Sequence, residues 1–209
     1  MTKSRRLRIF QHIPTLHTSR LTLRRMLPSD YRDMYEYACL PQVTEYLLWS
    51  PHVDADQTYR YLQSLQASYK QGEFYDWAVV LNEKGKMIGT CGYTEFDHEN
   101  RRAEIGYVLN PRYWGHGIAT EAVSAVMEFA FCELDINRLE AHFIEGNDRS
   151  RRVMEKCGMA FEGMLRQYMF IKGQYRNIGF CAATRDRFRP CGRYQKETQA
   201  GLLSRLFLS

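Results

Sequence analysis

Gly115 and Gly117, which are separated by one residue, follow a segment typical of a strand. They precede a run of apolar residues at helical spacing. The first turn of a helix exposes unpaired backbone N–H groups and carries about half a positive charge, so it attracts phosphate oxygens. Glycines, with the small Ala119, would let a diphosphate approach the backbone closely. The loop has neither the P-loop motif nor the three-glycine Rossmann motif. The alternative interpretation is a plain tight turn before a helix.

The residues from Glu104 to Ala122 resemble the signature of the GNAT N-acetyltransferases, whose cofactor loop reads Gln/Arg-x-x-Gly-x-Gly/Ala. The match here is Trp114-x-x-Gly117-x-Ala119, so the first position departs from the family pattern. The run from Trp114 to Ala122 is similar to the subgroup of Rim-type ribosomal-protein N-acetyltransferases. Five further segments fit that subgroup in the right order and extend the resemblance over about residues 18–185: 18–24, 103–107, 147–158, 162–166 and 173–176.

The resemblance implies acetyl-CoA as co-substrate, with its pyrophosphate on the amides of the glycine loop. It also implies that strand atoms at Val108 and Leu109 pair with the pantetheine arm, and that Asn147 contacts the cofactor where the next strand splays away. A solvated loop histidine is the alternative for His116. The predicted cofactor-binding residues are Val108, Leu109, Trp114, Gly115, His116, Gly117, Ile118, Ala119, Thr120 and Asn147.

Transfer of an acetyl group to an amine requires removal of a proton, because an α-amine has a pKa of about 7.7–8.0 and a lysine amine about 10.4. Glu104 is the predicted general base. It alternates with the apolar Ala103 and Ile105 in a strand that we expect to be central, where burial would raise its pKa. The alternatives are an exposed Glu104, or one paired with an arginine such as Arg102. Glu140 and Glu145 are rival bases.

Ser150 is the predicted general acid, placed to protonate the departing thiolate of CoA. It lies three residues after Asn147 in the first turn of a predicted helix, so both side chains can face the cofactor. The resemblance supports this role for the serine. The alternative is that Asn147, Asp148 and Ser150 only cap the helix. Tyr168 and Tyr175 are alternative proton donors.

The elements that must position these residues follow from hydrophobic periodicity and turn residues. Strands are expected at 21–24, 77–81, 87–96, 103–109, 138–143, 163–171 and 175–184. Helices are expected from about residue 30 to 38, from 54 to 69, after Gly117, and from about Arg149 to Lys156. This order predicts a mixed α/β (α+β) fold, and the resemblance implies the GNAT fold. We expect a central mixed, twisted sheet of about six to seven strands flanked by about four helices.

The 209 residues fit one domain, which we place at 18–188 between an N-terminal extension, 1–17, and a C-terminal tail, 189–209. The extension shows no periodicity, so we expect it to be loosely ordered. No apolar run approaches the roughly 20 residues of a membrane span, and the N-terminus lacks the pattern of a secretory signal, so we expect a cytoplasmic protein. The six cysteines contain no CxxC pair, so no metal is expected.

The sequence therefore predicts an acetyl-CoA-dependent N-acetyltransferase that works by direct attack, without a covalent enzyme intermediate. The expected acceptor is the N-terminal amine of a ribosomal or other protein. The alternatives are a small-molecule acceptor, such as a polyamine or an antibiotic, and a non-catalytic CoA-binding sensor. The net charge of +5 suits an anionic cofactor but is too small to indicate nucleic-acid binding. We expect no membrane or nucleic-acid partner, and either a monomer or a homodimer.

Overall fold

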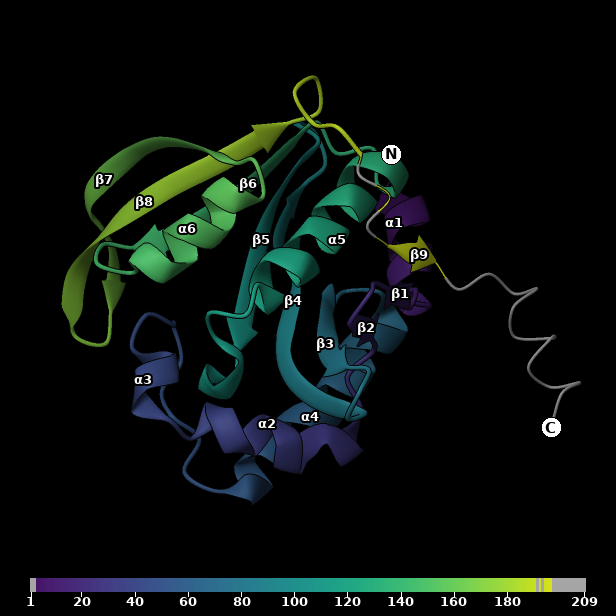
Figure 1. Cartoon of the computed structure of the whole chain (residues 1–209), viewed down its shortest axis with the longest axis vertical. Helices are drawn as coiled ribbons and strands as arrows, with labels where there is room; N and C mark the ends of the chain where they lie inside the picture. Colours follow the sequence, from purple (N-terminus) through teal and green to yellow (C-terminus); the bar gives the residue numbers. More distant parts are fainter. Residues whose placement is uncertain (1–2, 191, 193, 197–209) are drawn as a thin grey trace, which may run out of the picture.

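One sheet of nine strands organises the residues that the computed structural model describes, which are 3–190, 192 and 194–196 (Figure 1). The strands are β1 (Leu16–His17), β2 (Leu21–Arg24), β3 (Asp76–Leu81), β4 (Lys86–Asp97), β5 (Arg102–Leu109), β6 (Arg138–Ile144), β7 (Ala160–Ile171), β8 (Gln174–Thr184) and β9 (Gln195–Lys196). Their order is β7-β8-β6-β5-β4-β3-β2-β1-β9. Only β5 and β6 pair in parallel among these described strands.

Six α-helices accompany the sheet in the described part of the chain. They are α1 (Lys3–Gln11), α2 (Tyr31–Ala38), α3 (Pro41–Thr44), α4 (Ala55–Gln71), α5 (Ile118–Glu133) and α6 (Asp148–Lys156). Local sequence explains the bounds of α4, since the Asp54 side chain caps its first turn by accepting from the Gln57 N–H at 2.7 Å. Gly72 ends the helix with a φ of 72°.

Alternating residues divide the core between the two faces of the sheet. On β3, Trp77 and Val79 belong to the cluster that contains α5, whereas Ala78 and Val80 pack with α2 and α4. Figure 1 shows α5 and α6 on one side of the sheet and α2 with α4 near its lower end. The helices that carry the glycine loop and Ser150 therefore share one face, opposite α2 and α4.

The mixed α/β fold class predicted from the sequence is confirmed, and the long elements lie close to their expected bounds. The described residues contain more elements than expected, nine strands and six α-helices. Of the four additional elements, β1, β9 and α3 are too short to show a period, and α1 lies in the predicted N-terminal extension. For the described residues 3–17, the expectation of loose order is wrong: they include α1 and β1, and Phe10 is fully buried. Most of the predicted tail, 197–209, lies outside the described residues.

Candidate active site

The glycine loop joins β5 to α5 through a short 3-10 turn at Pro111–Tyr113. Gly115 and Gly117 have φ values of +82° and +74°, which favour glycine, and both are exposed. A Cβ atom at Gly115 would meet nothing within 4 Å, so the backbone there is open to an approaching group. No side chain caps α5 at Gly117. The first amides of this helix are therefore available to an anion, as the sequence predicts.

The outer side of the loop is braced by the segment before β2. Glu121, in the first turn of α5, accepts hydrogen bonds from Thr18 Oγ1 at 2.6 Å and from the Arg20 backbone N–H at 3.0 Å. Arg20 also donates to the His116 carbonyl at 2.9 Å. Burial acts to raise the pKa of Glu121, but the hydrogen bonds from Thr18, Arg20 and Ser19 outweigh it and lower that pKa. Glu121 is thus held as a carboxylate, and the brace fixes the loop without using its amides.

Trp114 connects the loop to both neighbouring elements. Its indole N–H donates to the Leu109 carbonyl at 2.8 Å, and the Arg149 guanidinium lies 4.7 Å from its ring centroid. The Val108 carbonyl oxygen lies against Gly89 of β4. The end of β5, the loop and the start of α6 therefore meet at Trp114, the position that departs from the family pattern.

The sheet splits beside this loop. Of the described residues, the β5–β6 ladder joins only Arg102–Glu104 to Arg138–Glu140, while β6 continues along β8 to Ile144. Beyond Glu104, the rest of β5 pairs with β4 alone. The structure thus separates two strands at the predicted base, leaving strand edges on either side of the split.

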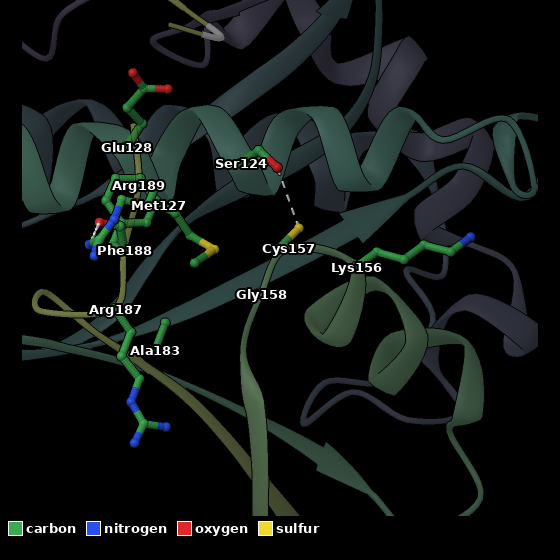
Figure 2. Close-up of a pocket in the computed structure, with 10 residues that line it drawn as sticks. All are labelled: Ser124, Met127, Glu128, Lys156, Cys157, Gly158, Ala183, Arg187, Phe188 and Arg189. Carbon is green, nitrogen blue, oxygen red and sulfur yellow. Dashed lines mark hydrogen bonds between the residues drawn. The ribbon is translucent and has the colours of Figure 1, made fainter. Parts of the chain in front are cut away.

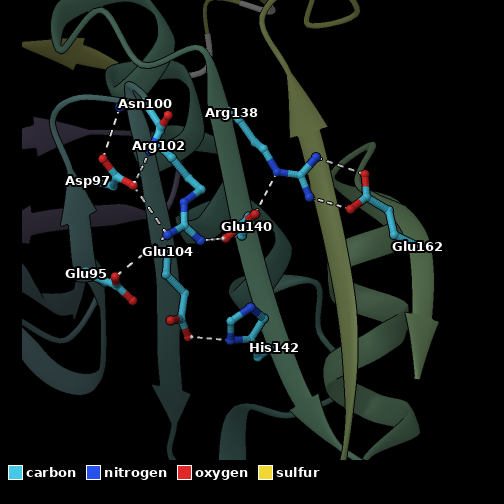
Figure 3. Close-up of polar contacts among 9 residues, drawn as sticks. All are labelled: Glu95, Asp97, Asn100, Arg102, Glu104, Arg138, Glu140, His142 and Glu162. Carbon is cyan, nitrogen blue, oxygen red and sulfur yellow. Dashed lines mark hydrogen bonds and ion pairs between the residues drawn. The ribbon is translucent and has the colours of Figure 1, made fainter. Parts of the chain in front are cut away.

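Two carboxylates oppose each other where pairing ends, and their partners differ (Figure 3). Glu140 accepts hydrogen bonds from Arg102 and Arg138, each at 2.6 Å. Burial acts to raise the pKa of Glu140, but the two arginines outweigh it and lower that pKa. This rival base is therefore neutralised by arginines. Glu104 instead faces Nδ1 of His142 at 3.3 Å, and its side chain is 24% exposed.

Ser150 lies near the start of α6, as expected, and is held by Tyr107 of β5. The two hydroxyl oxygens are 2.8 Å apart, and the Tyr107 hydroxyl also donates to the Ser150 carbonyl at 2.9 Å. Burial raises the pKa of Tyr107, so its hydroxyl keeps its proton. Asn147 caps α6 by accepting from the Ser150 N–H at 3.2 Å. Asn147 therefore caps α6, whereas the Ser150 hydroxyl contacts the Tyr107 hydroxyl.

The remaining predicted residues divide by exposure. His116 is exposed, Ala119 and Thr120 are half-buried, and the Ile118 side chain packs into the core, so Ile118 can offer only its backbone. The alternative donors Tyr168 and Tyr175 are exposed on the β7–β8 hairpin. Glu145, the other rival base, is exposed and accepts from Asn177 at 2.9 Å.

Three residues near the site were not predicted from the sequence: Tyr107, His142 and Asp76. Cross-strand pairing runs from Asp76 to Gly92 and on to Gly106, which places Asp76 on the sheet face of Glu104. Burial raises the pKa of Asp76 to about 7. The sequence carried no motif for His142 or Asp76, because cross-strand contacts depend on register.

A pocket of about 260 Å³ lies away from this site, between α5, the end of α6 and residues 183–189 (Figure 2). Cys157 in its wall donates to the Thr120 carbonyl, with the sulfur 3.6 Å from the oxygen. None of the predicted site residues lines it. The described residues contain no cluster of side chains that could hold a metal ion, and no described helix has the length and apolar character needed to cross a membrane.

Comparison with protein families matches residues 20–160 to the acetyltransferase (GNAT) domain. The uncharacterized N-acetyltransferase p20 of Bacillus licheniformis is 36% identical over 160 residues, covering 77% of this chain and 90% of that protein. The putative ribosomal N-acetyltransferase YdaF of Bacillus subtilis is 27% identical over 76% of this chain and 87% of its own length. Spermidine N(1)-acetyltransferase of Escherichia coli K12 is 34% identical, but over 47% of this chain and 53% of its own.

Solved structures share the fold. An acetyltransferase of the GNAT family from Bacillus anthracis superposes with a TM-score of 0.74 at 24% identity, covering 83% of this chain and 99% of that one. RimL, a ribosomal L7/L12 alpha-N-protein acetyltransferase solved with coenzyme A, gives a TM-score of 0.69 at 22% identity over 82% of this chain and 97% of that one.

Proposed function

Because this chain belongs to the GNAT acetyltransferase family, we propose that it transfers an acetyl group from acetyl-CoA to the N-terminal amine of a protein. The observation that carries the proposal is the exposed, uncapped start of α5 at Gly117 beside a sheet that splits at Glu104. A diphosphate at the start of α5 would leave the attached thioester within reach of the split. Coenzyme A in the RimL structure is consistent with this choice of co-substrate.

Acetyl-CoA, when bound, supplies the thioester carbon that the amine attacks. The amides of Gly117, Ile118 and Ala119 would bind its pyrophosphate, since no side chain caps them. Val108, Leu109 and Asn147 would contact the rest of the cofactor along the split. The Leu109 carbonyl already accepts a hydrogen bond from the Trp114 indole N–H, so a cofactor group bonded to it would share that oxygen with Trp114.

Glu104 would take the proton from the acceptor ammonium, directly or through one water, because Glu140 is held by arginines. The amine nitrogen then forms its bond to the acetyl carbon as the bond from carbon to sulfur breaks. Ser150, whose hydroxyl Tyr107 keeps oriented, would give its proton to the departing sulfur and regain one from the amide nitrogen, which loses its second proton as the amide forms. The proton taken by Glu104 then leaves to solvent. The products are the acetylated amine and CoA, and no bond to the enzyme forms.

A protein N-terminus is the preferred acceptor for three reasons. The relative named for a ribosomal acceptor aligns over 76% of this chain, against 47% for the spermidine enzyme. An α-amine loses its proton more easily than a lysine or polyamine amine does. The net charge of +5 also disfavours a polycationic acceptor.

The test is release of free CoA from acetyl-CoA with N-terminal peptides, including those of ribosomal proteins, and with spermidine. We expect turnover with peptides and an acetylated α-amine by mass spectrometry. Turnover with spermidine alone would identify the polyamine as the acceptor, and tight acetyl-CoA binding without turnover for any amine would indicate a sensor.

Glu104→Gln should lower kcat by about 10²-fold or more at pH 7.5 with little change in acetyl-CoA affinity. Glu95→Gln is the matched control, because Glu95 is the β4 partner of Glu104 and is 62% exposed.

A further inference from the structure

His142 lies two residues beyond Glu140 on β6, so both side chains project from the sheet face that carries Glu104. Its Nδ1 atom is 3.3 Å from Glu104 Oε1 across the point where the strands part (Figure 3). The imidazole also packs on Phe180 of β8, with ring centroids 3.9 Å apart. His142 is thus fixed by the strand on one side while it contacts the proposed base on the other.

The other imidazole nitrogen shows which tautomer this contact requires. His142 Nε2 is buried and has no hydrogen-bond partner among the described residues. A carboxylate oxygen can only accept, so in the neutral ring the contact with Glu104 is favourable when the proton sits on Nδ1. Protonation of Nε2 would bury an N–H donor without a hydrogen-bond partner, which is unfavourable.

We infer that His142 is a positioning residue, which holds the Glu104 carboxylate toward the acceptor amine through the 3.3 Å contact of its neutral Nδ1–H with that carboxylate. The inference rests on the proposed role of Glu104 as base. A neutral donor orients the carboxylate without the full positive charge that two arginines place on Glu140. The two cross-strand glutamates are therefore separated in function by their partners.

The test compares His142→Phe, which keeps an aromatic ring on Phe180, with His142→Asn, whose amide can donate from near the Nδ1 position. We expect His142→Phe to lower kcat at pH 8 by about tenfold, with the KM for acetyl-CoA changed less than about twofold. His142→Asn should recover most of that loss.

A double variant separates this inference from the proposed function. If His142 acts through Glu104, adding His142→Phe to Glu104→Gln should lower kcat no further. A further tenfold loss in the double variant, or a wild-type kcat in His142→Phe beside an impaired Glu104→Gln, would overturn the inference alone. Wild-type activity in Glu104→Gln would remove the base assignment and the inference with it. Thermal unfolding of each variant checks that the fold is retained.

Discussion

Glu104 and Glu140 are paired residues on adjacent strands, yet the structure gives them different partners. Glu140 joins a network of Arg102, Arg138 and Glu162 that ties β5, β6 and β7 together (Figure 3). Such a network stabilises the junction from which the strands diverge. Glu104 lies at the edge of this network, and its ion-pair contact among the described residues is with His142, not with an arginine.

The Ser150 hydroxyl can be separated from its structural surroundings by a matched pair of variants. Ser150→Ala should lower kcat by about 10²-fold with little change in the KM for acetyl-CoA, because it removes the proposed proton donor. Ser124→Ala on α5 also removes a hydroxyl, one that contacts Cys157. Each change should cost at most about 1–3 kcal/mol of stability. Steady-state kinetics with equal losses of kcat in both variants would contradict the acid role.

Asp76 makes stability depend on pH in a direction opposite to most carboxylates. Burial raises its pKa from 3.8 to about 7 in the folded protein. In the unfolded chain the same carboxyl loses its proton at about pH 4. The free energy of unfolding that depends on Asp76 is therefore greatest below about pH 4 and decreases as the pH rises to about 7. Asp76→Asn should remove that loss and raise Tm relative to the wild type at pH 8 more than at pH 5.

The control for this measurement is Asp56→Asn on α4, a carboxylate with a highly exposed side chain. It should leave the difference in Tm between pH 5 and pH 8 as in the wild type. If Asp76→Asn shows no pH-dependent gain by differential scanning calorimetry, the Asp76 carboxyl titrates near its ordinary value.

Sequence patterns predicted residues whose roles depend on their own segment. Strand alternation predicted that Glu104 faces the other side of the sheet from Ala103 and Ile105. The structure confirms this, since Ala103 and Ile105 are buried whereas the Glu104 side chain is 24% exposed. His142 was not predicted because its contact with Glu104 depends on the parallel pairing of β5 and β6. That pairing places two residues that are 38 positions apart in the sequence side by side. The sequence placed Tyr107 in a family motif but predicted no role for its side chain, because its contact with Ser150 joins β5 to α6.

At the scale of elements, the glycine loop should be the most sensitive part of the cofactor site. Gly117→Val would place a branched side chain among the first amides of α5, so acetyl-CoA affinity should fall at least about tenfold, or 1.4 kcal/mol. Gly85→Val is the control, because Gly85 also has a positive φ, +60°, and open space around its Cβ. Both variants carry similar backbone strain. Equal affinities by calorimetry would mean that the loop does not bind the cofactor.

Long elements were predictable because their apolar period repeats several times, and the short ones were not. Helix α5 presents a continuous buried stripe, whereas β1 and β9 have two residues each and α3 has four. The sequence did predict that residues 18–24 matter, by resemblance alone. The structure supplies the reason, since Thr18, Ser19 and Arg20 all donate to Glu121 beside the loop.

At the scale of the whole molecule, the N-terminal helix is part of the core. Phe10 of α1 is fully buried and meets Tyr75 and Trp77 at ring-centroid distances of 4.7 and 5.9 Å. Phe10→Ala should therefore lower the free energy of unfolding by about 3–5 kcal/mol. Arg8→Ala, at an exposed position on the same helix, should change it by less than about 0.5 kcal/mol. Urea unfolding that gives the same midpoint for both would show that α1 does not contribute to the fold.

The interrupted ladder between β5 and β6 has a consequence for isotope labelling. Past Glu104, amide hydrogens of β5 that do not face β4 lack a partner strand in the described sheet, so they should exchange readily with deuterium. An extended ligand lying in the split would take the place of that strand and slow this exchange. Peptides spanning residues 105–109 should thus gain protection on saturation with CoA, whereas those from β3, already paired on both sides, should not.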